Sequence, residues 1–105
     1  MAIVHPTAEN FGALIRDNKL VLVDFFATWC GPCKMLTPVF EELSVELNGK
    51  AKFVKVDIDE SSEIASRFQV VNVPTLKVFK DGKVVKTLVG FRPKEALLSE
   101  LSDLI

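Results

Sequence analysis

The 105-residue sequence predicts an α/β fold in which one mixed β-sheet carries helices on both faces. Apolar, strand-like runs alternate with segments whose apolar residues recur at helical spacing, which is typical of parallel strands joined by right-handed crossovers. The run at 20–27 is apolar on both faces, as expected for a central strand covered on both sides. Asp81-Gly82 separates two further strand-like runs and indicates an antiparallel hairpin at the edge of the sheet.

The first half of the chain is expected to contain two strands and two helices. Pro6 ends the first strand, because the residue before a proline is pushed away from the helical conformation. Thr7 then caps the first helix, and Asn48-Gly49 closes the second one. The expected elements are strand 3–4, helix 7–17, strand 20–27 and helix 30–48.

The second half is expected to contain three strands and two helices. Gly90 breaks the last strand, and Pro93 suits the first turn of the last helix, where its missing N–H would have no partner. The expected elements are strand 52–59, a short helix from 61 or 62, strand 76–79, strand 84–89 and helix 93–105.

The expected order is therefore β-α-β-α-β-α-β-β-α, in a single domain over residues 1–105. The last helix should bury an apolar side made of Leu97, Leu98, Leu101, Leu104 and Ile105. Six aromatic side chains are assigned to the core: Phe11, Phe25, Phe40, Phe53, Phe68 and Phe79.

The composition argues against several classes of protein. A formal net charge of −1 leaves no basic field that could hold nucleic acid or an anionic membrane. No segment is apolar for long enough to span a bilayer, and residues 1–6 lack the features of a signal peptide. Two cysteines are too few for a disulfide-stapled secreted scaffold. We therefore expect a monomer in a reducing compartment, the cytoplasm.

The chemistry is concentrated in the segment Trp29-Cys30-Gly31-Pro32-Cys33-Lys34, which holds both cysteines and the only tryptophan. It follows the central strand and opens a helix, whose dipole and unpaired N–H groups stabilise a thiolate. Cys30, at the helix start and nearer solvent, should attack a substrate disulfide, and Cys33 should then attack Cys30 and release the substrate. The alternatives are a pair of inert core thiols, or half of a zinc site with His5 as a distant third ligand.

Asp24 is a second candidate, because it interrupts an otherwise apolar strand. Burial of a lone carboxylate is costly, and it should raise the pKa of Asp24. The alternative is an aspartate that turns to solvent at a strand edge.

These segments resemble the thioredoxin family along essentially the whole chain. The resemblance rests on 23–25, the motif at 29–34, Pro38, 57–59, 73–75, the 81–82 hairpin and Gly90. It implies the thioredoxin fold and a general protein-disulfide reductase that maintains cell redox homeostasis and transfers electrons. One position departs from the family pattern, because Phe26 stands where the family often has a second tryptophan.

The resemblance also implies roles for further residues. A buried acid, Asp24, would take and return the proton of Cys33, and Lys55 would lie near Asp24 and modulate it. Gly31 and Pro32 would tune the redox pair. A solvated lysine on a sheet face is the alternative for Lys55.

Substrate binding is implied for four residues around the cysteines. The bond before Pro74 would be cis, and the backbone of Val73 would face an extended substrate strand. Trp29 and Gly90, with the two residues between the cysteines, would complete a flat apolar rim. The alternative for Gly90 is a simple strand terminator.

The expected partners are disulfide-containing proteins and an electron donor, either thioredoxin reductase or a ferredoxin-dependent equivalent. No cofactor is expected besides the redox-active disulfide, because the chain has no glycine-rich dinucleotide fingerprint. Two other functions remain open. An oxidase or isomerase would run the exchange in reverse, although Gly31-Pro32 resembles the reductase type. A binding module would dock partners through the apolar rim, with incidental thiols.

Overall fold

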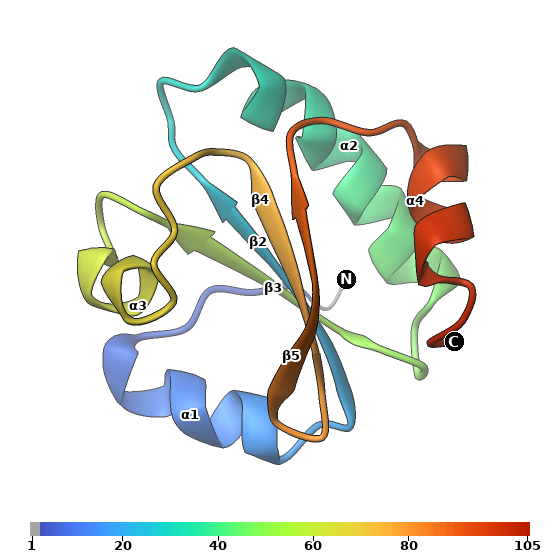
Figure 1. The fold of residues 1–105 in the computed structure, drawn as a ribbon, viewed down its shortest axis with the longest axis horizontal. Helices are drawn as coiled ribbons and strands as arrows, with labels where there is room; N and C mark the ends of the chain where they lie inside the picture. Colours follow the sequence, from blue (N-terminus) through green and yellow to red (C-terminus); the bar gives the residue numbers. More distant parts are fainter. Residues whose placement is uncertain (1–2) are drawn as a thin grey trace.

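In the computed structural model, which describes residues 3–105, five strands form one sheet in the order β1-β3-β2-β4-β5 (Figure 1). The first two residues of the expected domain 1–105 lie outside the described residues. The elements are β1 (Ile3–Val4), α1 (Ala8–Arg16), β2 (Leu20–Phe26), α2 (Gly31–Glu46), β3 (Lys52–Asp57), α3 (Ser62–Arg67), β4 (Thr75–Lys80), β5 (Lys83–Val89) and α4 (Lys94–Leu101). The expected order of strands and helices is confirmed.

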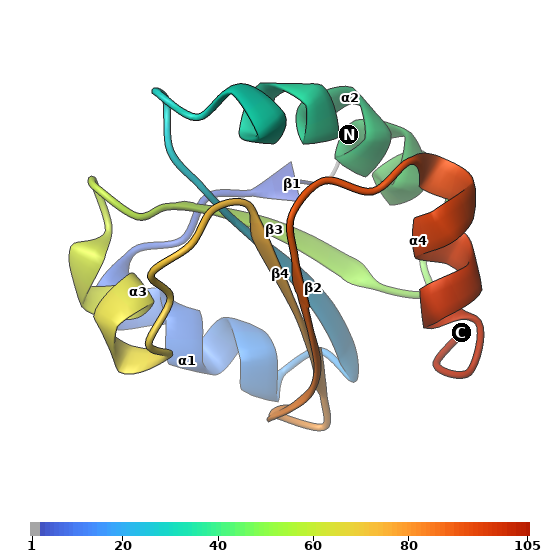
Figure 2. The ribbon, with the colours of Figure 1, turned by 45° about the horizontal axis from the view of Figure 1, so that its top comes forward.

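The helices form two layers, one on each face of the sheet (Figure 2). Alternate residues of β2 point to opposite faces, so this central strand contributes to both cores. Val21, Val23 and Phe25 pack against α1 and α3, whereas Leu20 and Leu22 pack against α2 and α4. The expectation of a central strand covered on both sides is confirmed.

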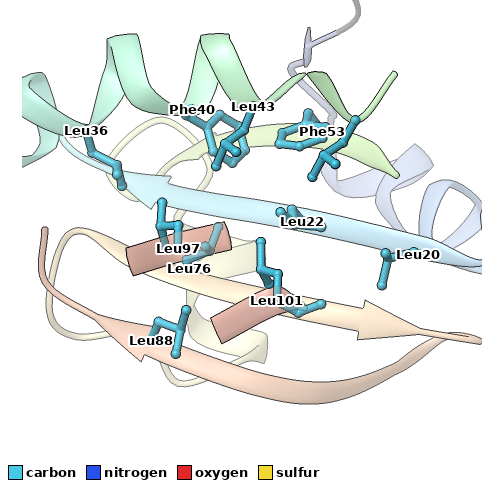
Figure 3. Close-up of a cluster of buried hydrophobic side chains, with 12 residues drawn as sticks. Leu20, Leu22, Leu36, Phe40, Leu43, Phe53, Leu76, Leu88, Leu97 and Leu101 are labelled. Atoms are coloured by element: carbon cyan, nitrogen blue, oxygen red, sulfur yellow. The ribbon is translucent and has the colours of Figure 1, made fainter. Parts of the chain in front are cut away.

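The core under α2 and α4 is built mainly from leucine and phenylalanine. Leu36, Phe40 and Leu43 follow one face of α2 and point toward β2, where Leu22 lies below them (Figure 3). The rings of Phe40 and Phe53 meet edge to face, with 5.0 Å between their centroids. This packing fixes α2, and therefore its first turn, on the sheet.

The connection from β3 to β4 differs from the expected pattern of parallel crossovers. β3 is parallel to β2 and to β1, but β4 is antiparallel to β2. β3 ends at Asp57 beside Phe26, and β4 begins at Thr75 beside Phe25. Because the six-residue helix α3 starts and finishes at one end of the sheet, β4 must run back in the opposite direction.

The hairpin between β4 and β5 is confirmed. Asp81 and Gly82 have φ angles of 52° and 83°, the left-handed conformation at both central positions that a type I′ turn requires. Two strands are shorter than expected, since β2 ends at Phe26 and β3 at Asp57. The Asp57 carboxylate accepts the N–H groups of Asp59 and Glu60, which turns the chain out of the sheet.

The last helix is also shorter than the expected 93–105. α4 ends at Leu101, because the hydroxyl and the N–H of Ser102 both donate to the carbonyl of Ser99 and tighten the chain. Leu97 and Leu101 are buried as expected, but Ile105 lies beyond the helix and is exposed. The assignment of Ile105 to the buried side was therefore wrong.

Five of the six assigned phenylalanines are buried, and the sixth, Phe68, is half-buried against the core of α1 and α3. Thr7 caps α1 as expected, and its hydroxyl accepts the N–H of Asn10. Within residues 3–105, no helix is long and apolar enough to cross a membrane.

We predict that Phe40→Ala lowers the free energy of unfolding by about 3–5 kcal/mol, because it opens a cavity in a fully buried cluster. Val45→Ala is the matched control, since Val45 lies on the same helix with its side chain exposed, and it should change stability by less than about 0.5 kcal/mol. Urea unfolding of both variants measures the difference. Similar losses in the two variants would contradict the assignment of Phe40 to the core.

Candidate active site

Cys30 and Cys33 form a disulfide at the start of α2, with their Cα atoms 5.3 Å apart. Both residues are buried, Cys30 at 5% and Cys33 at 2% exposure, so Cys30 is slightly nearer solvent, as expected. They pack with Ala27 and against the side chains of Ile58 and Val73. The sulfurs are bonded to each other, which excludes the alternative of a pair of free, inert core thiols.

The backbone around Cys30 is arranged to stabilise negative charge on its sulfur. Cys30 is the N-cap residue of α2, and its Sγ accepts the N–H of Cys33 at 3.2 Å. A helix N-terminus leaves N–H groups without partners inside the helix, so a thiolate at this position gains hydrogen bonds. Gly31 and Pro32 occupy the first two helical positions and are exposed. The site can therefore present a stabilised thiolate once the disulfide is reduced.

Asp24 is completely buried in β2, which rules out the alternative of a solvent-facing carboxylate. It shares a face of the strand with Leu22, which packs under α2. Neither carboxyl oxygen has a hydrogen-bond partner. Burial raises the pKa of Asp24 to about 6, and the positive charge of Lys55 opposes part of that rise. The group can therefore hold or release a proton near neutral pH.

Lys55 is the cross-strand neighbour of Asp24 on β3 and is half-buried, so it is not an ordinary solvated lysine. Its ammonium group donates to the hydroxyl of Thr37 at 3.2 Å. It also lies 4.5 Å from the centre of the Phe26 ring, a cation–π arrangement.

The expected substrate-binding residues come from three segments of the chain, at Trp29, at Val73-Pro74 and at Gly90. The Val73–Pro74 peptide bond is cis, as the resemblance implied, and Val73 packs against the cysteines. The N–H of Gly90 donates to the carbonyl of Pro74 at 2.8 Å. Gly90 directly follows β5 and has a φ of 95°, so it both ends the strand and lies beside the cysteine-facing loop.

Trp29 directly precedes Cys30 in the chain. It is 68% exposed, and its indole N–H donates to the Asp59 carboxylate at 2.9 Å. The hydrogen bond fixes the orientation of the ring and still leaves most of its surface exposed. A large, oriented aromatic face beside a disulfide is a suitable contact for another protein.

Two hollows lie near the site. One of about 240 Å³ is lined by Phe26, Ala27, Thr28, Cys33, Lys34, Thr37 and Lys55, and it gives solvent a route toward Cys33. A larger one of about 680 Å³ lies around His5, Asp57 and Glu60 and does not include either cysteine. Over residues 3–105, no group of three or more His, Cys, Asp or Glu side chains is placed to hold a metal ion.

The structure adds two residues to those selected from the sequence. Thr37 could have been found, because its spacing of four residues from Cys33 places both on one helical face. Asp59 lies in the 57–59 segment of the resemblance, but nothing in the sequence linked it to Trp29, since thirty residues separate the two and only the fold brings them together.

Comparisons with known proteins agree with this geometry. The thioredoxin family model matches residues 2–103. Curated relatives include thioredoxin of Bacillus subtilis, 55% identical over 92% of both chains, and thioredoxin of Staphylococcus haemolyticus, 52% identical over 96% of both. A solved structure of Plasmodium falciparum thioredoxin is 41% identical and superimposes over the whole of both chains with a TM-score of 0.89.

We predict that Asp24→Asn stabilises the oxidised protein in a pH-dependent way. The folded protein binds the Asp24 proton more tightly than the unfolded chain, whose ordinary pKa is 3.8. The contribution of Asp24 to wild-type stability should therefore fall as the pH rises from about 4 to about 6 and then stay level. The amide of the variant cannot titrate, so the advantage of Asp24→Asn should grow by about 3 kcal/mol over this range.

Urea unfolding between pH 4 and pH 8 measures this difference. Asp17→Asn, at the exposed end of α1, controls for the change in net charge. Parallel stability curves for wild type and Asp24→Asn would show that folding does not raise the Asp24 pKa.

Proposed function

The chain belongs to the thioredoxin family, and from this membership we propose which residues carry each step of its reaction. It has the thioredoxin fold, and it is a protein-disulfide reductase that works by dithiol–disulfide exchange. Its redox centre is the Cys30–Cys33 pair. The observation that carries the proposal is that this disulfide begins the helix that covers the buried carboxyl of Asp24.

In the first step, the Cys30 thiolate attacks one sulfur of a substrate disulfide. A new bond forms between Cys30 and that sulfur, the substrate disulfide breaks, and the other substrate sulfur leaves as a thiolate. Three features support Cys30 as the attacking residue: its N-cap position, the N–H of Cys33 directed at its sulfur, and its slightly greater exposure. Gly31 and Pro32 tune the pair through the helix start that they form.

In the second step, Cys33 attacks the Cys30 sulfur of the mixed disulfide. The Cys30–Cys33 disulfide forms, the bond between Cys30 and the substrate breaks, and the second substrate sulfur leaves as a thiolate. The substrate has then gained both electrons, and its two thiolates take up one proton from water and one that Asp24 returns. Asp24 takes the proton of the Cys33 thiol, which generates the attacking thiolate. Its raised pKa, about 6, suits an acid–base group that works near neutral pH.

Substrate binds over the apolar rim formed by Trp29, Val73, Pro74 and Gly90, with Gly31 and Pro32 between the cysteines. The exposed ring of Trp29 and the contact of Val73 with the cysteines support this surface. The backbone of Val73 pairs with an extended substrate segment, as in strand addition.

We further propose that the chain acts in the cytoplasm as one domain and as a monomer. Family membership supports disulfide-bonded proteins as substrates and a separate reductase as electron donor. The donor is thioredoxin reductase or a ferredoxin-dependent equivalent. Nucleic acid and membranes are not proposed as partners, because the net charge is only −1.

We predict that Cys33→Ser accumulates a stable mixed disulfide with a disulfide-bonded protein substrate, because Cys30 attacks and nothing resolves the product. Non-reducing electrophoresis and mass spectrometry measure the adduct and locate it on Cys30. Cys30→Ser is the control and should trap far less substrate. Equal trapping by both variants would contradict the assignment of Cys30 as the attacking and Cys33 as the resolving cysteine.

We predict that Trp29→Ala raises KM for a disulfide-bonded protein by roughly tenfold, about 1.4 kcal/mol, with little change in stability. Val45→Ala is the matched control, since Val45 is 65% exposed and Trp29 is 68% exposed. Steady-state reduction assays measure both variants. An unchanged KM for Trp29→Ala would exclude the indole from the binding surface.

A further inference from the structure

The hydroxyl group of Thr37 joins two parts of the active site. It donates to the carbonyl oxygen of Cys33 at 3.1 Å, one turn earlier in α2. The same oxygen accepts a hydrogen bond from the ammonium group of Lys55 at 3.2 Å, across the gap between α2 and β3. The orientation of the hydroxyl is thus set by the backbone of the second cysteine, and the position of the ammonium is set by the hydroxyl.

Lys55 has a nearby acceptor that it does not use. Asp24 is its cross-strand neighbour, and both oxygens of that carboxyl are buried without a hydrogen-bond partner. A buried carboxylate would ordinarily draw a neighbouring ammonium into contact. Here the ammonium is held instead by Thr37 and by the face of the Phe26 ring, 4.5 Å from its centre.

We propose that Thr37 is a positioning residue, whose hydroxyl holds the Lys55 ammonium out of hydrogen-bond contact with Asp24. The carboxyl then remains unpaired and retains its proton at a higher pH than a paired one. The link to catalysis rests on the proposed role of Asp24 as the acid–base partner of Cys33. The placement of Lys55 is independent of that role.

Removal of the hydroxyl should release Lys55 toward Asp24. Thr37→Val keeps the branched shape of the side chain but leaves the ammonium without its acceptor. The lysine stem is anchored on β3 beside Asp24, so the unpartnered carboxyl is the buried acceptor within its reach. An ammonium that approaches to within about 4–6 Å favours the ionised carboxylate and lowers the pKa of an aspartate by about one to three.

One other acidic group near Asp24, the half-buried Asp57, lines the same hollow as Lys55. On β4 the residue opposite Asp24 is the apolar Leu76. On β3 the next side chain on the same face is Asp57, whose Oδ1 accepts two backbone N–H groups. A released ammonium that moved to its Oδ2 instead would leave the Asp24 titration in place. On α2 the titratable groups near this region are Lys34, which is exposed, and Cys33, whose sulfur is bonded to Cys30 in the oxidised protein.

The test is a carbon-detected NMR titration of the Asp24 carboxyl in the oxidised 105-residue chain, in which neither cysteine titrates. Thr37→Val should lower the titration midpoint by about one pH unit or more. Thr37→Ser keeps the hydroxyl and should leave the midpoint within about 0.3 pH units of wild type. Lys55→Met, introduced into wild type and into each Thr37 variant, completes a double-mutant cycle. Without the ammonium group, Thr37→Val should no longer shift the titration midpoint of Asp24.

A midpoint that stays in place or rises in Thr37→Val would overturn the proposal. A shift that persists with Lys55→Met would do the same, because it would show an effect that does not pass through the ammonium.

The pH profile of substrate reduction then separates this proposal from the proposed role of Asp24. If Asp24 exchanges the Cys33 proton, the acid limb of the profile should move with the NMR midpoint in Thr37→Val. A moved midpoint with an unmoved profile would uphold the placement of Lys55 and reject Asp24 as the acid–base group.

Discussion

A carboxyl group buried without a hydrogen-bond partner is the constraint on which the rest of this structure depends. Burial of Asp24 destabilises the fold above its pKa of about 6, and neither oxygen recovers that loss through a protein donor. The same strand with an apolar residue in place of Asp24 would be more stable. The chain retains an acid under the redox helix, where a group that titrates near neutral pH can exchange the proton of a thiol.

The surrounding packing makes that constraint tolerable. Leu36, Phe40 and Leu43 hold α2 against β2, and Leu97 and Leu101 of α4 extend the same core. Each fully buried side chain of this kind contributes about 1.5–3 kcal/mol, so a few of them offset an unpaired carboxyl. The same packing holds the first turn of α2 rigidly, which keeps the N–H of Cys33 aimed at the Cys30 sulfur. Stability and reactivity therefore depend on one helix.

Local signals in the sequence were sufficient for most of the fold and for the centre of the site. The alternation of apolar runs, the Asp81-Gly82 turn and the two cysteines at a helix start each carry their information within a few residues. The direction of β4 could not be read locally, because it depends on the path of the short helix α3 across one end of the sheet. The early end of α4 depends on the side chain of Ser102, which competes with the helix for a carbonyl.

The antiparallel return of β4 also explains why the site needs the whole fold. Because β4 starts beside the end of β2, the cis Val73–Pro74 bond lies at the same end of the sheet as the cysteines. β5 then runs back to that end of the sheet, where the N–H of Gly90 donates a hydrogen bond to the carbonyl of Pro74. A parallel β4 would have carried Pro74 to the opposite end of the sheet, away from the disulfide. The direction of β4, which the local sequence patterns did not indicate, is therefore what brings Val73, Pro74 and Gly90 of the proposed substrate surface to the redox pair.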